Sequence, residues 1–355
     1  MTQHVPKNIL VTGGAGFIGA NFVHYYFSRY PGRPVVVLDA LTYAGNYANL
    51  QPISEHPGLT FVHGDIRDDD LVLSLLKEHK IDTIVHFAAE SHVDRSIHGP
   101  DAFIDTNVVG THALLKAAKV RWLDTGTGMA HRFHHVSTDE VYGTLGPEDP
   151  PFSEETPYRP NSPYAASKAG SDHLVRAYHE TYGLQTTISN CSNNYGPYQF
   201  PEKLIPLVIS RIMDSGEIPV YGDGRQIRDW LYVDDHNAGI DVILNSGIPG
   251  ETYNIGGNNQ TTNIDIIHHI CDCLEDRYPG ARSLITHVTD RPGHDRRYAI
   301  NADKIRRELD FSPQHNFNAG IRKTIEWYLA NESWWRKVMD GSYREWVRAN
   351  YEQRR

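Results

Sequence analysis

Short runs of β-branched and aliphatic residues alternate with helical patterns over the first 193 residues of this chain. Six runs have the composition of strands: NILVTG (8–13), PVVVLDA (34–40), LTFVHGD (59–65), DTIVHFAA (82–89), HRFHHVST (131–138) and LQTTISNCS (184–192). Amphipathic segments such as 70–79 and 106–119 lie between them. Several runs are apolar at consecutive positions, which is typical of strands covered on both faces. The alternation predicts right-handed βαβ units, and hence an α/β fold with a parallel sheet between two layers of helices.

The regular alternation ends near Asn193. Three later segments are rich in Pro, Gly, Arg and Tyr and are expected to be loops: 193–203, 219–230 and 289–299. Helical patterns lie at 264–278 and 321–339. Because no repeat or flexible linker is present, we expect two packed units. One is a domain of residues 1–190, to which about 229–257 return, and the other is a smaller α/β lobe of residues 191–355.

Composition and charge limit the classes of partner. The net charge of −10 argues against nucleic acid or an anionic membrane as the main partner. No apolar stretch is long enough to span a bilayer or to form a signal-peptide core. Three cysteines cannot form a disulfide framework in 355 residues, and the 20 histidines lack metal-site spacing. We therefore expect reduced thiols, a cytoplasmic location and no metal.

A glycine-rich turn follows the first predicted strand. Gly13, Gly16 and Gly19 form a GxxGxxG spacing that permits a tight turn and brings backbone N–H groups close to a pyrophosphate. Asp39, 20 residues after Gly19, ends the second strand, where it can accept a hydrogen bond from a ribose 2′-hydroxyl. A carboxylate there repels a 2′-phosphate, so the pattern predicts NAD, not NADP, in a Rossmann-like, doubly wound domain. Asp65 is expected near the adenine, and a plain turn without a nucleotide is the alternative.

A tyrosine and a lysine lie four residues apart in SPYAASKAG, on one face of the helix that begins there. The ammonium of Lys168 can stabilise a Tyr164 phenolate; lowering a tyrosine pKa to near neutral requires roughly 4 kcal/mol. In isolation, the pair is better explained as an ordinary surface contact. Thr138, at the end of a strand 26 residues upstream, adds a hydroxyl. The three groups behind a glycine turn form a more specific set, typical of a catalytic site.

Motifs from residue 11 to 300 resemble the extended short-chain dehydrogenase/reductase family, in the branch that acts on nucleotide sugars. They are VTGGAGFIGANF, DALTYAGN, HFAAESHVDRSI, HHVSTDEVYG, YAASKAGSDHLVRAY, NCSNNYGPYQFPEKLIP, PVYGDGRQIRDWLYVDDH and TDRPGHDRRYAI. The resemblance implies a hydro-lyase with tightly bound NAD and dTDP-glucose as substrate. It would oxidise carbon 4, remove water across carbons 5 and 6, and return hydride to carbon 6. Alternatives are a UDP- or GDP-linked substrate, an epimerase or decarboxylase on the same fold, and a non-enzymatic NAD-binding protein.

Two adjacent carboxylates, Asp139 and Glu140, follow Thr138 in the segment STDE. This segment could be a helix capping box, but Gly143 and Gly146 follow at once and leave no room for a helix. For both acids to reach one substrate, the chain must leave the strand there, because neighbouring strand residues point to opposite faces. Losing water needs one base and one acid, and repulsion between adjacent carboxyls keeps them in different protonation states. By resemblance, Glu140 is the base and Asp139 the acid; related epimerases carry small residues here.

The same resemblance assigns the remaining site residues. Those expected to bind the cofactor are Gly13, Gly16, Phe17, Ile18, Gly19, Asp39, Leu41, Thr42, Gly45, Asp65, Ile66, Ala88, Ala89, Ser91, Thr106, Tyr164, Lys168 and Asn194. Those expected to bind the nucleotide sugar are Ser91, Thr138, Asn193, Lys203, Leu204, Pro219, Tyr221, Arg228, Asn263, Arg291 and His294. The resemblance also implies a homodimer that pairs the helices around 106–119 and 165–182. Their apolar stripes include Val109, Leu114, Leu115, Leu174, Val175 and Tyr178, and these could instead face only the sheet.

Overall fold

A seven-stranded sheet is the largest element of the computed structural model, which describes residues 4–126, 128–290 and 294–339. Its strand order is β10-β6-β5-β4-β1-β2-β3, and every pairing is parallel. The strands are β1 (Ile9–Thr12), β2 (Val35–Asp39), β3 (Leu59–His63), β4 (Thr83–His86), β5 (Arg132–Thr138), β6 (Thr186–Cys191) and β10 (Thr252–Ile255). The strand order reverses between β1 and β4, where doubly wound sheets bind ligands. The predicted Rossmann-like fold class is confirmed.

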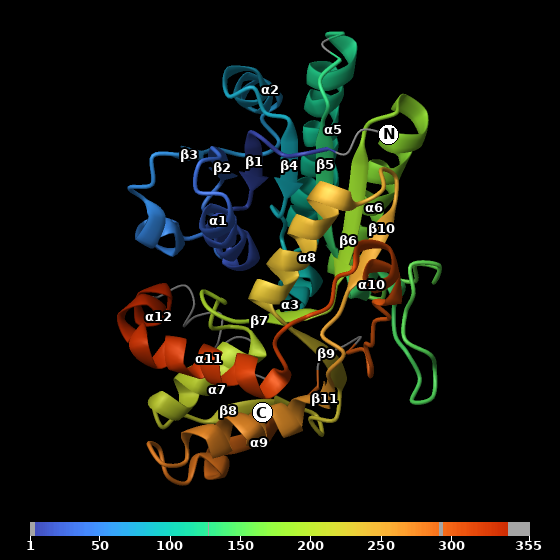
Figure 1. The fold of residues 1–355 in the computed structure, drawn as a ribbon. Helices are drawn as coiled ribbons and strands as arrows, with labels where there is room; N and C mark the ends of the chain where they lie inside the picture. Colours follow the sequence, from blue (N-terminus) through green and yellow to red (C-terminus); the bar gives the residue numbers. More distant parts are fainter. Residues whose placement is uncertain (1–3, 127, 291–293, 340–355) are drawn as a thin grey trace.

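Helices cover both faces of this sheet (Figure 1). On one face, α1 (Phe17–Arg29) and α8 (Val233–Ser246) pack together. Phe22 of α1 and Ile240 of α8 are fully buried in the apolar core on this side of the sheet. The other face is covered by α2 (Asp69–Glu78), α5 (Thr111–Lys119) and α6 (Pro163–Tyr182). Short helices complete this part of the chain: α3 (Val93–His98), α4 (Asp101–Phe103) and α10 (Asp303–Leu309). Burial on both faces explains why the strand sequences are nearly continuous runs of Val, Ile and Leu.

The helix predicted at 106–119 has a mixed geometry. It begins as a π-helical turn, Ile104–Gly110, and continues without a break into α5. Within the turn, the Asn107 side chain bonds to both backbone groups of Glu90 and donates to the Ser167 hydroxyl of α6, at 2.8–3.0 Å. π-helical turns are often found at functional sites. This one holds the loop after β4 against the helix that carries Tyr164 and Lys168.

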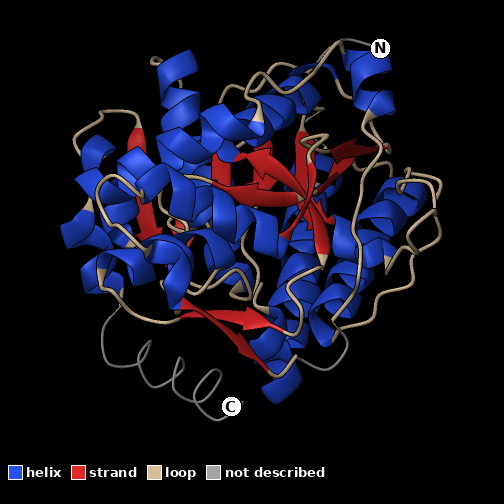
Figure 2. Cartoon of the chain, turned by 90° about the horizontal axis from the view of Figure 1, so that it is seen from below, coloured by secondary structure: helices blue, strands red, loops and turns tan. Residues whose placement is uncertain are grey.

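The second half of the chain forms a smaller lobe at the carboxyl end of the sheet (Figures 1 and 2). Its helices α7 (Leu204–Met213), α9 (Asn263–Leu274), α11 (Phe317–Ala330) and α12 (Glu332–Val338) share one apolar core. Its strands are β7 (Asn193–Tyr195), β8 (Ile218–Tyr221), β9 (Ile227–Tyr232), β11 (Gln260–Thr262) and β12 (Ile285–Val288). The prediction of loops at 193–203 and 219–230 is therefore wrong in part. These short strands pair with distant partners, β9 with β7 and β11, and β8 with β12, which no local pattern reveals.

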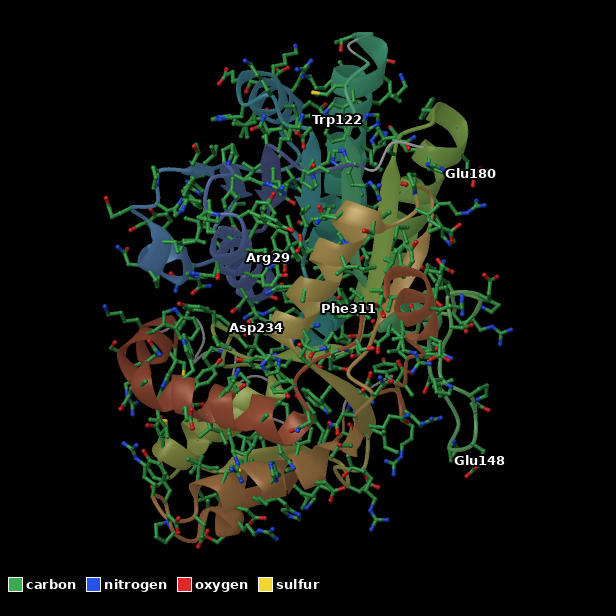
Figure 3. All side chains as sticks on the ribbon, in the orientation of Figure 1. Arg29, Trp122, Glu148, Glu180, Asp234 and Phe311 are labelled. Atoms are coloured by element: carbon green, nitrogen blue, oxygen red, sulfur yellow. The ribbon has the colours of Figure 1, made fainter. Side chains whose placement is uncertain are left out.

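The chain returns from the lobe to the sheet through α8 and β10. Asp234, near the start of α8, lies at the level where the sheet meets the lobe (Figure 3). β10 then pairs with β6, from Thr252 opposite Ile188 to Ile255 opposite Cys191. Among the described residues, no helix combines the length and apolar character that crossing a bilayer requires.

Candidate active site

Two neighbouring cavities open where the carboxyl ends of the strands meet the lobe. The larger, of about 340 Å³, runs from the glycine turn after β1 to the ends of β5 and β6. The smaller, of about 180 Å³, lies between α3 and the lobe. Seven residues line both cavities: Ser91, Glu140, Asn193, Asn194, Gln199, Glu202 and Lys203. The two cavities therefore adjoin and have these seven residues in common.

Nearly all the residues predicted to bind the cofactor line the larger cavity. The exception is Leu41, whose side chain packs against the core beneath α1 and whose N–H donates to Asp39. Thr106 reaches the cavity from the π-helical turn, and Asn194 reaches it from β7. The structure thus gathers segments from seven places in the sequence around one elongated space.

The glycine turn packs too closely for side chains. Gly13 has a φ of 70°, and a Cβ built on it would lie 2.6 Å from the backbone nitrogen of Ala88. A Cβ on Gly19 would overlap the carbonyl oxygen of Gly13. The helix α1 begins directly after Gly16, with no side chain capping its first N–H groups. Because these donors are uncapped and face the larger cavity, the turn is suited to a pyrophosphate.

The carboxylate of Asp39 joins two loops at the other side of this turn. Its two oxygens accept hydrogen bonds from the backbone N–H groups of Ala15 and Leu41, each at 2.8 Å. Burial raises the pKa of Asp39, while these two donors oppose the rise. A Cβ on Gly45 would lie 2.6 Å from the same carboxylate, so the loop closes directly over it. An acceptor held in this way fits a ribose hydroxyl.

The end of β5 carries the acidic pair. The strand stops at Thr138, and residues Asp139–Tyr142 form a 3₁₀ turn. Thr138 caps this turn, since its hydroxyl accepts from the N–H of Glu140 at 3.3 Å. Ser137 instead donates to the carboxylate of Asp172, at 2.8 Å. The capping-box alternative is therefore wrong. The chain leaves the strand directly after Thr138, so both acids lie in the turn.

The two acids occupy different environments. Asp139 is 2 % exposed, and its Oδ2 has no hydrogen-bond partner among the described residues. Burial raises the pKa of Asp139 well above its ordinary value, and the nearby Glu140 and Asp229 raise it further. Glu140 is less buried and lines both cavities, whereas Asp139 lines neither. The arrangement suits a protonated acid beside an accessible carboxylate.

Tyr164 and Lys168 project from the first turns of α6, which Ser162 caps at 3.1 Å from the N–H of Ala165. Tyr164 shares a hydrogen bond with the Thr138 hydroxyl. Burial, and then the charge of Glu140, raise the pKa of Tyr164 well above 10. The Nζ of Lys168 donates a hydrogen bond to the carbonyl of Val136 at 2.8 Å, which holds the ammonium against the end of β5.

The predicted sugar-nucleotide residues are divided between the two cavities. Thr138 lines the larger cavity, and Arg291 lies outside the described residues. The others line the smaller cavity: Ser91, Asn193, Lys203, Leu204, Pro219, Tyr221, Arg228, Asn263 and His294. Arg228 is buried, donates to the carbonyls of Ile227 and Asp295 at 2.8 and 2.9 Å, and stacks on Tyr298. Lys203 donates to the Ser91 carbonyl at 3.2 Å.

Sequence reasoning missed several residues that the structure places at the site. Glu202 lines both cavities and is buried, with Arg95 of α3 at 3.2 Å from its carboxylate. Arg95 also lies over the Tyr43 ring, 4.1 Å from its centroid. In the sequence, Glu202 could have been noticed as a charged residue next to Lys203 in a loop expected at the rim of the site. The Arg95–Tyr43 contact joins segments about 50 residues apart, and no spacing rule reveals it.

A comparison with protein families agrees with this geometry. Residues 10–324 match the family described as GDP-mannose 4,6 dehydratase. The chain belongs to the nucleotide-sugar 4,6-dehydratases of the extended short-chain dehydrogenase/reductase family. Within that family, its relatives include the dTDP-glucose 4,6-dehydratase of Xanthomonas campestris pv. campestris, 57% identical over 94% of this chain and 97% of the relative. The dTDP-glucose 4,6-dehydratase 1 of Escherichia coli K12 is 53% identical over 98% and 99%.

Solved structures extend the same result. A dTDP-glucose 4,6-dehydratase from Streptomyces venezuelae, solved with NAD and dTDP, has a TM-score of 0.87 and 49% identity over 93% of this chain and 99% of its own. A UDP-glucose 4-epimerase from Thermotoga maritima, solved with UDP-glucose, has a TM-score of 0.82 at 26% identity, over 92% and 99%. The resemblance read from the motifs is confirmed. The described residues hold no group of three or more His, Cys, Asp or Glu placed to bind a metal.

Replacing Gly19 with alanine should destabilise the glycine turn. The added Cβ would meet the Gly13 carbonyl and the Cα of Gly14, which is 2.9 Å away, so the backbone must shift. We expect the free energy of unfolding to fall by about 1–3 kcal/mol, as for other overpacked sites. Gly32→Ala is the matched control, because a Cβ there has no neighbour within 4 Å. Urea unfolding of both variants measures the difference; equal stabilities would contradict the close packing.

Proposed function

We propose that this protein is a dTDP-glucose 4,6-dehydratase that uses tightly bound NAD. The observation that carries the proposal is the acidic pair at the end of β5. Asp139 is buried with a raised pKa, Glu140 faces both cavities, and Tyr164 lies within hydrogen-bonding reach of Thr138 beside them. An oxidoreductase or epimerase needs the tyrosine, but only an elimination needs an acid and a base as well.

The larger cavity is the proposed cofactor site. The uncapped N–H groups of α1 would bind the pyrophosphate, and Asp39 would accept from a ribose hydroxyl. When bound, NAD supplies the hydride acceptor and donor, together with a positive ring whose charge favours a Tyr164 phenolate. The carboxylate of Asp39 excludes a 2′-phosphate, which is why we assign NAD and not NADP. The remaining work falls to residues of the chain.

Tyr164 would take the proton from the 4-hydroxyl of the sugar, and the Thr138 hydroxyl would be hydrogen-bonded to the same oxygen on carbon 4. Formation of the ketone at carbon 4 acidifies the proton on carbon 5. Glu140 would remove that proton as the base, and Asp139 would protonate the departing 6-hydroxyl as the acid. Glu140 then returns a proton to carbon 5. The contrast in burial between the two acids supports this division of roles.

The smaller cavity is the proposed site of the nucleoside diphosphate. Residues Leu204, Pro219 and Tyr221 offer apolar and aromatic surface for a base, and cationic side chains of Lys203 and Arg228 lie in the same wall. We propose residues 1–190, with about 229–257, as the cofactor-binding domain, and residues 191–355 as mainly the sugar-nucleotide lobe. Small diphosphate substrates and reduced cysteines support a cytoplasmic enzyme.

Isotope transfer tests the function directly. dTDP-glucose carrying deuterium at carbon 4 should lose one water and give a product with deuterium at carbon 6 of the same molecule. The reaction has no net redox change, so no added reductant is needed. UDP-glucose and GDP-mannose serve as comparison substrates and should lose water far more slowly. Mass spectrometry of mixed labelled and unlabelled substrate gives the answer; deuterium crossing between molecules would overturn the mechanism.

The roles of the acids can be separated from oxidation. Asp139→Asn combined with Glu140→Gln should still permit hydride removal from carbon 4, because Thr138 and Tyr164 are intact. Water loss should fall by about 10²–10⁴-fold for each acid–base role removed.

The control is Glu148→Gln with Asp149→Asn, another adjacent acidic pair. Both residues are exposed and line neither cavity, and Glu148 lies at the end of a projecting loop (Figure 3). This variant changes the net charge equally and should eliminate water at the wild-type rate. Mass spectrometry of quenched reactions follows water loss. Near wild-type elimination by the Asp139–Glu140 variant would remove the assignment.

A homodimer through the helices around 106–119 and 165–182 remains our proposal, with a revised set of contacts. Leu114, Leu115 and Val175 are fully buried within one chain and cannot reach a partner, whereas Val109 is 47 % exposed. Ile104 (47 %), in the same π-helical turn, and Tyr182 (48 %), at the end of α6, are also exposed. Val109→Asp should therefore lower the mass measured by light scattering to that of a monomer, and Ile248→Asp, at an equally exposed site elsewhere, should not. A monomeric wild-type protein would contradict the proposal.

A further inference from the structure

Lys168 is a buried cation that requires a negative partner. Lys168 is only 3 % exposed, and its Nζ donates to the Val136 carbonyl at 2.8 Å. A carbonyl satisfies a hydrogen bond but does not neutralise a charge, and an unpaired buried ammonium tends to lose its proton. Burial indeed lowers the pKa of Lys168, to about 8. Some group nearby must keep it charged near neutral pH.

The groups that face Lys168 leave one candidate. From β4 and β5 come His86 and His135, and burial lowers the pKa of both imidazoles well below 6.5, so both are neutral. From β6 comes Cys191, whose thiol is also neutral because burial raises its pKa to about 12. Among the described residues that face Lys168, Asp172, one turn further along α6, is the one with a negative charge, and its effect is to raise the pKa of Lys168.

Two hydroxyl groups hold the carboxylate of Asp172 in place. Its Oδ2 accepts from the Ser137 hydroxyl at 2.8 Å and from the Tyr158 hydroxyl at 3.0 Å. Its Oδ1 lies 3.2 Å from Nε2 of His135, and the same Nε2 lies 3.3 Å from Nζ of Lys168. The neutral imidazole thus stands between the carboxylate and the ammonium. Asp172 is 2 % exposed, so solvent does not screen this interaction.

We propose that Asp172 is a positioning residue whose negative charge holds Lys168 as a charged ammonium beside Tyr164. This rests on the proposed function and adds to it that the charge of Lys168, together with that of bound NAD, favours the Tyr164 phenolate. Asp172 touches neither cavity, and its role is electrostatic. The face of α6 that carries Tyr164 and Lys168 therefore has a third member four residues on.

The charge states define a pH window for this role. Burial raises the pKa of Asp172 to about 6, and His173 and Lys168 oppose the rise. Asp172 is ionised above that pH, and Lys168 is protonated below about 8. Both charges are present between these limits. Removing the carboxylate lowers the pKa of Lys168 further, so activity that needs the ammonium must be lost at a lower pH.

The first test compares pH profiles of kcat. Asp172→Asn keeps the size of the side chain and an acceptor for Ser137 and Tyr158, but removes the charge. We expect the alkaline limb of the profile to move down by about 1 pH unit or more, giving about 10-fold lower kcat on that limb. Tyr158→Phe is the control, because it removes a hydrogen bond from the same Oδ2 and leaves the charge. Its limb should stay at the wild-type position, and coincident limbs for all three proteins would overturn the inference.

The second test measures stability and does not depend on activity. If the two charges are partners, Asp172→Asn should lower the Tm of the wild type and raise the Tm of Lys168→Met, where the carboxylate has no cation to balance. The comparison within the Lys168→Met background holds even where Asp172→Asn alone does not fold. Tm changes of the same sign and size in both backgrounds would refute the pairing. A wild-type protein that never eliminates water would refute the proposed function and leave this result intact.

Discussion

The hydrogen bond from Lys168 to the Val136 carbonyl ties α6 to the end of β5, and the active site depends on this attachment. β5 supplies Thr138 and the acidic pair, while α6 supplies Tyr164. Neither element carries all of these side chains. Because the lysine reaches across to the strand, the phenol and the two carboxyls stay in register, and Ser137 reinforces the contact by donating to Asp172. Positioned groups of this kind contribute to catalysis by holding their geometry before the substrate arrives.

Much of the site could be predicted from the sequence because its signals are local. The glycine spacing, the acid at the end of the second strand and the i,i+4 pair on α6 each follow from the geometry of a single element. The short strands β7, β8 and β9 could not be predicted, since their hydrogen bonds are made with segments far along the chain. The direction of the Tyr164 pKa was also beyond reach. It depends on burial and on Glu140, which come together only in the folded chain.

The comparison structures show that this fold hosts more than one reaction. A UDP-glucose 4-epimerase shares it at 26% identity with a TM-score of 0.82, close to the values for dehydratases at nearly twice the identity. Fold alone therefore does not select the outcome. We propose that in this chain the outcome is decided by a turn of four residues, Asp139–Tyr142, which follows the strand and places two neighbouring carboxyls in unlike surroundings. A small change of backbone direction has a large chemical effect.

Because Asp139 is buried, the proton that it gives up in the proposed reaction must be returned to it through the protein. In the proposed reaction, Tyr164 finishes with one proton more than it began with, and Asp139 finishes with one fewer. The next turnover can begin only after a proton has moved from the Tyr164 phenol to the Asp139 carboxylate. The Thr138 hydroxyl is hydrogen-bonded to Tyr164 and lies 3.4 Å from Oδ1 of Asp139. Oδ2 of Asp139 is buried away from solvent. In the proposed reaction the Thr138 hydroxyl therefore relays a proton from Tyr164 to Asp139. The proton that restores the acid then comes from the 4-hydroxyl of the substrate.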